Sequence, residues 1–150
     1  MASSTDKKLI ILTTENDKLI KSFEKELDYK KDKRIIFTSS VYDLELLKKI
    51  REQAYAYIQG HEVGGTNPSL LEGLASTDLN LVYGVKFNRE VAGEAAFYWK
   101  KSDGNLTQLI NKAEQLGAEK IEGLGFETRK RTAIKYDWEK IVKEYVGIFS

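Results

Sequence analysis

The sequence predicts an α/β fold, in which a parallel sheet is flanked by helices. Short apolar runs suited to strands buried on both faces alternate with segments whose apolar residues recur at helical spacing. Such alternation is typical of parallel sheets, because two parallel strands need a long crossover between them. The 150 residues can form a substantial core, and we expect a single domain over residues 1–150.

The predicted elements follow in order along the chain. The first helix is capped by Asn16 or Asp17, and the second by Asp43. The charged residues 28–33 form a solvated connector, and residues 84–91 a loop after the fourth strand. The predicted strands are residues 8–13, 34–38, 54–58, 79–83 and 95–99.

The last third of the chain is predicted to be helical. One helix covers residues 106–116, with Asp103 as its cap and Gly117 as its end. A last helix starts near residue 136. Gly123 and Gly125 leave the boundaries between these two helices open.

A glycine loop before a capped helix is the most informative segment. It contains Gly64 and Gly65 and ends at Asn67, a good N-cap, and Pro68, the only proline, which suits the first helical position. A strand, a glycine loop and a capped helix present amides and a positive helix end to an anion, most often phosphate. The segment fits a tight turn without a ligand equally well.

The charged side chains near this loop each have two interpretations. Glu72, about one turn into an apolar helix face, is either solvated or accepts hydrogen bonds from sugar hydroxyls. His61, the only histidine, is either structural or catalytic, and Glu62 is either loop surface or a ligand for sugar hydroxyls. Arg89 is either solvated or bound to phosphate.

Composition excludes several classes of protein. A formal net charge of +1 gives no steering toward nucleic acid, so we expect no nucleic-acid partner. The absence of cysteine, the single histidine and the lack of an acidic cluster argue against a metal site. The cysteine-free sequence favours a cytoplasmic protein, and no apolar run reaches membrane-spanning length.

Several segments resemble a known family. Residues 34–37, 41–47, 59–75 and 88–91 are similar to the C-terminal half of retaining family-four glycosyltransferases of the GT-B fold. The stretch from His61 to Glu72 looks most like the bacterial rhamnosyltransferase branch, which builds capsular or cell-wall polysaccharide. The central motif is specific, whereas the outer segments are ordinary α/β sequence.

The resemblance implies a Rossmann-like domain that holds a nucleotide-sugar donor, dTDP-L-rhamnose, without a metal or other cofactor. It implies that Glu72 binds the nucleotide ribose, and that Glu62 and His61 are the catalytic candidates at the transferred sugar. Val41 and Tyr42 correspond to the loop beside the base. The other donor-binding residues that it implies are Gly64, Gly65, Thr66, Asn67, Ser69, Asn88 and Arg89.

The sequence departs from the family pattern in two ways. The spacing from Glu62 to Glu72 is longer than in the family motif, so His61 or the amides of Gly64 and Gly65 could share the role of Glu62. The family's first strand and its diphosphate-neutralising Arg and Lys have no counterpart before Lys8.

The second departure suggests a fragment of a two-domain enzyme that is inactive alone. The expected partners are the N-terminal acceptor domain of the same protein and a membrane-associated, lipid-linked acceptor. The full-length enzyme would then lie at the inner face of the membrane.

The alternative is a non-catalytic Rossmann-like or flavodoxin-like module that binds nucleotide or a partner. Receiver-type modules need an acidic cluster where strands end. The first two strands here end in Thr13-Thr14 and Thr38-Ser39, which argues against that type.

Overall fold

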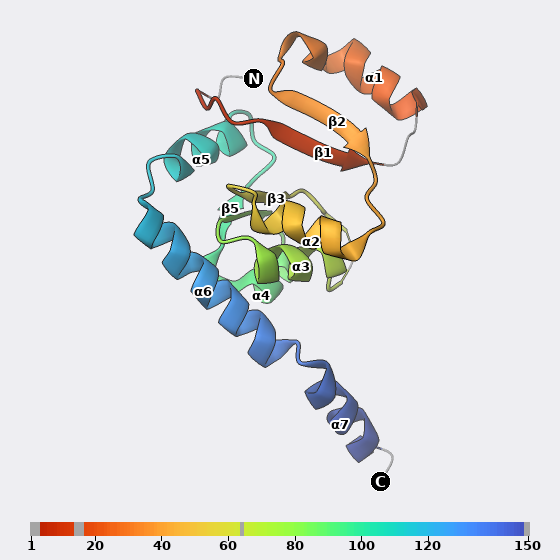
Figure 1. Cartoon of the computed structure of the whole chain (residues 1–150), viewed down its shortest axis with the longest axis vertical. Coiled ribbons are helices and arrows are strands. Elements are labelled where there is room, and N and C mark those ends of the chain that lie inside the picture. The colour runs from red at the N-terminus through yellow and green to blue at the C-terminus, as the bar shows by residue number, and fades with distance from the viewer. Residues whose placement is uncertain (1–3, 14–16, 64, 149–150) are drawn as a thin grey trace. The chain divides into compact units, whose positions relative to one another are not determined.

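Parallel strands and helices alternate along the protein in a computed structural model that describes residues 4–13, 17–63 and 65–148 (Figure 1). The chain divides into two compact units, Ser4–Leu47 and Lys48–Ser150. Each unit contains its own parallel sheet, so the α/β class is confirmed.

The unit Ser4–Leu47 is built on two parallel strands, β1 (Leu9–Thr13) and β2 (Ile35–Ser39). They are connected by α1 (Asp17–Leu27) and a short 3-10 helix, η1 (Tyr29–Lys31). The predicted order of strand, helix and strand is therefore confirmed.

Exposure alternates along the strands of this unit. Ile10 is 54% exposed, and Leu12 and Ile36 are each 36% exposed. Because successive side chains of a strand point to opposite faces, one face of this sheet is largely open. The prediction that the first strand is buried on both faces is wrong. Asn16, one of the two proposed caps of α1, lies outside the described residues.

The unit Lys48–Ser150 contains three parallel strands in the order β3-β4-β5. The strands are β3 (Tyr57–Gln59), β4 (Asn80–Tyr83) and β5 (Phe97–Trp99), the last preceded by the 3-10 turn η2 (Gly93–Ala95). The helices are α3 (Pro68–Ser76), α4 (Lys86–Ala92), α5 (Asn105–Ala113), α6 (Ala118–Lys135) and α7 (Trp138–Ile148).

One further helix, α2 (Leu44–Glu52), begins in the first unit and ends in the second. The Leu46 amide donates to Oδ1 of Asp43 at 3.0 Å, which confirms Asp43 as the predicted cap of this helix.

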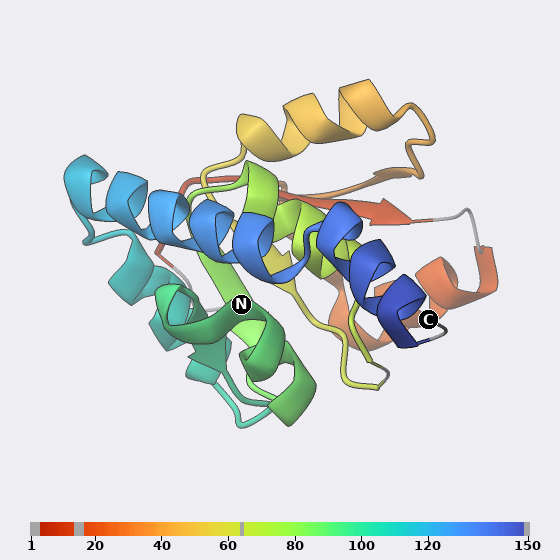
Figure 2. The ribbon, with the colours of Figure 1, turned by 90° about the horizontal axis from the view of Figure 1, so that it is seen from below.

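Strand β4 lies in the middle of the three-stranded sheet and is buried on both faces. Val82 is completely buried against Leu70 of α3 and Val91 of α4. Leu81 belongs to a separate core cluster that includes Ala113 of α5. Helices thus cover both faces, as a parallel sheet requires. Figure 2 shows α6 running across α3, with which it is in contact.

The predicted loop at residues 84–91 is instead largely helix α4. The Arg89 amide donates to the Val85 carbonyl at 3.1 Å, and Asn88, Val91 and Ala92 are buried along one side of the helix. A helix of seven residues is too short to reveal its period in the sequence, which explains the error.

The remaining corrections concern element boundaries. Strand β3 begins and ends later than residues 54–58. Gly104, with a φ of 74°, occupies the N-cap position of α5 in place of Asp103. Residues 118–135 form one continuous helix through Gly123 and Gly125, and Gly117 precedes it.

Candidate functional site

The carboxyl ends of β3, β4 and β5 lie at one edge of their sheet, because the three strands are parallel. The loops that leave this edge are residues 60–67, 84–85 and 100–104. In open α/β sheets, ligands bind at this edge. Most of the predicted site residues lie on these three loops or on the helices that follow them.

The loop after β3 ends in the predicted helix cap. Oδ1 of Asn67 accepts a hydrogen bond from the Ser69 amide at 2.9 Å, and Pro68 is the first residue of α3. The cap is confirmed, and it removes Ser69 from the amides available to an anion, while Pro68 has none to offer. Among the described residues, no hydrogen bond occupies the amides of Thr66 and Asn67. Gly64 lies outside the described residues, and Gly65 is exposed.

Replacing Asn67 with alanine is expected to lower the free energy of unfolding by about 1 kcal/mol, because α3 loses its side-chain cap. Urea denaturation, monitored by circular dichroism, would measure this loss of stability. Asn67→Asp keeps an acceptor and places a negative charge at the helix start, so its free energy of unfolding should stay close to that of the wild type. If Asn67→Ala is as stable as the wild type, this hydrogen bond does not cap the helix in solution.

Glu72 is paired with an arginine from α2. Its Oε2 lies 2.8 Å from Nη1 of Arg51, and the side chains are 46% and 13% exposed respectively. Burial raises the pKa of the nearby Tyr57 phenol to about 12, with Arg51 opposing this rise and Glu72 adding to it. The Tyr57 ring leaves no room for a side chain at position 73, where a Cβ would lie 2.4 Å from Cδ1 of Tyr57. Glycine at this position therefore allows α3 to approach β3.

Asn88 ties the glycine loop to the end of β4. Its Nδ2 donates to the carbonyls of His61 and Tyr83, each at 3.0 Å, and the side chain is completely buried. Any effect of Asn88 on a ligand would therefore act through the loop that it holds. Among the described residues, no hydrogen-bond partner meets the buried Oδ1 of Asn88 or the buried Nε1 of Trp99. The His61 side chain is exposed.

Glu62 forms an ion pair with Lys101, which lies just after β5. The carboxylate of Glu62 raises the pKa of Lys101 by accepting its hydrogen bond. Nζ of Lys101 lies 5.6 Å from the centre of the Tyr83 ring, which packs against Trp99 at the edge of the sheet. Glu62 and Glu72 thus have different cationic partners, one on the loop after β5 and one on α2.

Arg89 is held beside the end of β4. Its Nε donates to the Gly84 carbonyl at 3.1 Å, and its guanidinium carbon lies 4.1 Å from the centre of the Tyr98 ring. Burial raises the pKa of Tyr98, and Arg89 acts in the opposite direction. The side chain is therefore ordered by the protein rather than freely solvated.

Val41 and Tyr42 belong to the unit Ser4–Leu47, between β2 and α2. Val41 is half-buried and Tyr42 is 82% exposed. Their contact with a nucleotide base stays a prediction.

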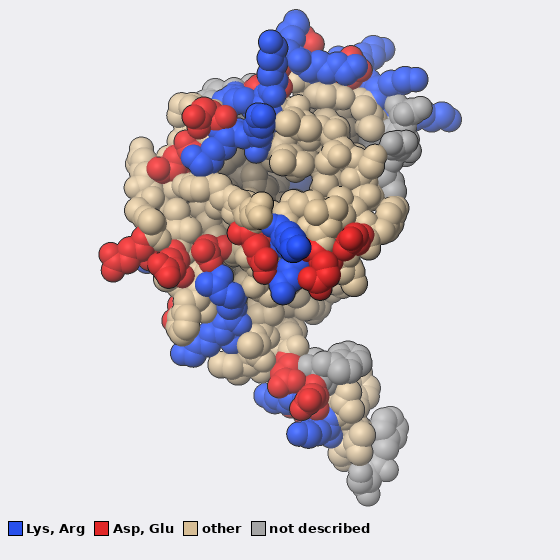
Figure 3. Space-filling model, viewed as in Figure 1, with Lys and Arg blue, Asp and Glu red and all other residues tan. Residues whose placement is uncertain are grey.

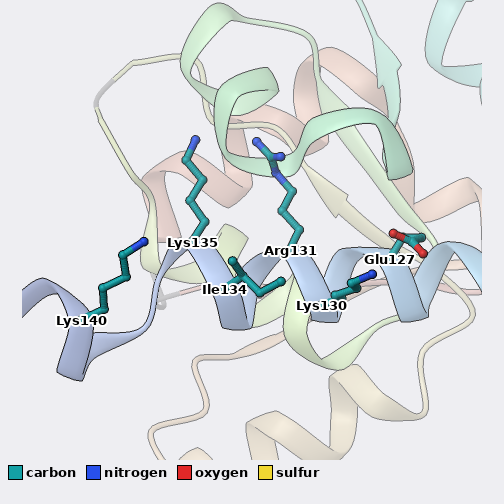
Figure 4. A pocket seen from close by; sticks show the side chains of 6 residues that line it. All are labelled: Glu127, Lys130, Arg131, Ile134, Lys135 and Lys140. Carbon is teal, nitrogen blue, oxygen red and sulfur yellow. The ribbon is translucent and has the colours of Figure 1, made fainter.

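Arg131 and Lys135 of α6 help to line a shallow depression of about 430 Å³, but both side chains hydrogen-bond to main-chain carbonyls of the protein itself. Figure 4 shows Arg131 and Lys135 pointing from α6 toward α4. Arg131 donates to the carbonyls of Glu90 and Val91 at 2.6 and 2.9 Å, and Lys135 lies 3.3 Å from the same Glu90 carbonyl. Carbonyls in the last turn of a helix generally lack partners within it, so the two cations act as a C-terminal cap of α4.

Two residues that pair with the predicted site residues Glu72 and Glu62 were not predicted from the sequence, namely Arg51 and Lys101. Each is one lysine or arginine among 24, with no local pattern that marks it. Within residues 4–13, 17–63 and 65–148, no group of three potential ligands is placed to hold a metal. In the same residues, no helix is long and apolar enough to cross a bilayer.

No family model matches the sequence, and no curated protein matches it. Among solved structures, the chain is similar to the crystal structure of a glycosyltransferase from Rickettsia africae ESF-5, with a TM-score of 0.77 and 12% sequence identity. The match covers 96% of this chain and 39% of the other, so the chain spans about two fifths of the length of that glycosyltransferase. This likeness confirms the predicted Rossmann-like fold class, in which parallel strands are flanked by helices.

Proposed function

We propose that the chain is the donor-binding domain of a retaining glycosyltransferase, the C-terminal half of a family-four GT-B enzyme. The observation that carries this proposal is helix α3. It starts at the carboxyl edge of a parallel sheet, has the amides of Thr66 and Asn67 at its amino end, and bears the half-exposed carboxylate of Glu72 about one turn later. The likeness to part of a solved glycosyltransferase adds support.

The donor that fits the sequence resemblance best is dTDP-L-rhamnose, used in the synthesis of bacterial polysaccharide. Its diphosphate would meet the amides of Thr66 and Asn67, where the positive end of α3 favours negative charge. Glu72 would accept a hydrogen bond from the sugar of the nucleotide. Glu62 and His61 would lie near the transferred sugar.

Arg89 is the nearby cation that would stabilise the leaving diphosphate, because its guanidinium is already ordered beside the end of β4. The sequence resemblance places the acceptor on an N-terminal domain of the same protein. A membrane-associated lipid-linked acceptor, a cytoplasmic location and a reaction without a metal ion are further parts of this proposal.

Titration with dTDP tests the proposal directly. Amide shifts in a ¹⁵N-labelled protein should concentrate between Gly65 and Glu72 and at Arg89, and the Val41 amide tests the predicted base contact separately. Thymidine is the matched control, because it lacks the diphosphate and should leave the amides of Thr66 and Asn67 unmoved. Scattered shifts, or none at millimolar dTDP, would reject donor binding and favour a non-catalytic interaction module.

A further inference from the structure

Arg51 is fixed to helix α3 at two points. Its guanidinium contacts the Glu72 carboxylate, with 2.8 Å between Nη1 and Oε2. Its main-chain carbonyl accepts a hydrogen bond from Oγ1 of Thr77 at 2.8 Å, and Thr77 is a buried residue that ends α3. The last turn of α2 is therefore bound both to the middle and to the end of α3.

The two partners of this ion pair differ in their access to water. The Arg51 side chain is only 13% exposed, whereas Glu72 is 46% exposed. Burying a guanidinium costs hydration energy, and solvent weakens its attraction to a half-exposed carboxylate. Stability alone is therefore a weak explanation for the pair.

The geometry leaves part of the carboxylate available. An ionised carboxylate has two acceptor oxygens with about four lone-pair sites. Within the part of the chain that the structure describes, Arg51 contacts Oε2, and no hydrogen bond occupies Oε1 of Glu72. Holding a flexible side chain in one orientation before a ligand arrives removes part of the entropy lost on binding.

We propose that Arg51 is a positioning residue that orients Glu72 to accept a hydrogen bond from a hydroxyl of the nucleotide sugar. This inference rests on the proposed donor-binding function. It assigns to Arg51 an effect on one contact, the sugar hydroxyl, and none on the diphosphate.

The test compares two nucleotides that differ by one hydroxyl, dTDP and its 3′-deoxy analogue. Isothermal titration calorimetry on the wild type should show that dTDP binds more tightly. Arg51→Met removes the charge and keeps an unbranched chain of similar length. It should weaken dTDP binding by about 3- to 10-fold, as expected when one side chain must be ordered on binding, and leave the analogue almost unaffected. The preference for dTDP over the analogue should shrink by the same factor.

Two further variants complete the design. Arg51→Lys retains a cation within reach of Glu72 and should restore part of the preference; it also provides the answer if Arg51→Met does not fold. Lys49→Met changes an exposed lysine on the same helix and should bind both nucleotides as the wild type does.

The outcomes separate this inference from the function on which it rests. A wild type that binds neither nucleotide rejects both. A wild type that prefers dTDP, with an equal preference in Arg51→Met and Arg51→Lys, rejects the positioning role alone. If Arg51→Met weakens the binding of both nucleotides by the same factor, Arg51 has a structural role and the positioning role is rejected. If Arg51→Met binds dTDP more tightly than the wild type does, Arg51 competes with the ligand and the positioning role is likewise rejected.

Discussion

Gly125→Ala is expected to destabilise the unit Lys48–Ser150 by about 3 kcal/mol, at the upper end of the range for overpacking a well-packed interior. Gly125 is buried in α6 where this helix approaches Asp78. A Cβ at this position would lie 1.9 Å from Oδ1 of Asp78 and 2.8 Å from its Cα. A rotamer change could move the carboxylate, but the clash with the main chain of Asp78 can be relieved only by moving the backbone. Urea unfolding, monitored by circular dichroism, would measure this loss of stability.

Gly123→Ala is the matched control on the same helix. A Cβ at Gly123 would meet nothing within 4 Å, and the residue is exposed. Because alanine favours the helix over glycine, this variant should gain up to about 1 kcal/mol. Equal effects of the two substitutions would contradict the close approach of α6 to Asp78.

Glu72→Ala is expected to weaken dTDP binding by about 10- to 100-fold, because hydrogen bonds to charged groups contribute about 1.5–3 kcal/mol. In the proposed two-domain enzyme, turnover should fall severely. Removing the carboxylate also leaves Arg51, 13% exposed, without its ionic partner, so stability must be measured alongside affinity. Calorimetry with dTDP gives the affinity, and thermal unfolding shows whether the variant remains folded.

Two controls distinguish loss of a ligand contact from loss of structure. Glu72→Gln keeps the shape and an acceptor for Arg51, so a folded Glu72→Gln protein with weakened binding supports a role for the negative charge. Glu52→Ala removes a glutamate from another exposed ion pair, with Lys48, and should change neither affinity nor stability appreciably. Near-normal dTDP binding by Glu72→Ala would remove Glu72 from the site.

Helix α7 is amphipathic and carries charges of both signs. Figure 3 shows acidic and basic side chains side by side on this helix, which carries Glu139, Lys140, Lys143 and Glu144. Val146 and Tyr145 of the same helix are 60% and 64% exposed. Because both signs of charge are present, this helix offers no single-sign surface that would steer a charged partner toward it.

The sequence alone predicted the features that depend on near neighbours. The caps at Asp43 and Asn67 were found because an N-cap binds an amide two or three residues later in the chain. The strands predicted at residues 8–13, 34–38 and 79–83 match the observed ones closely, because each is a short apolar run, whereas β5 begins later than predicted and Ala95 lies in η2. Pro68 at the start of α3 follows from its lack of an amide proton.

Tertiary structure decided what depends on residues far apart in the chain. Arg51 meets Glu72, Lys101 meets Glu62, and Asn88 holds the carbonyl of His61, and no local pattern marks any of these pairs. The place of Gly125 is also decided by packing. Glycine usually weakens a helix, but it stands inside α6 here because only a hydrogen atom fits beside Asp78. Hydrogen-bonding capacity and helical period are properties of neighbouring residues, whereas the partner of a side chain is set by how helices and strands pack.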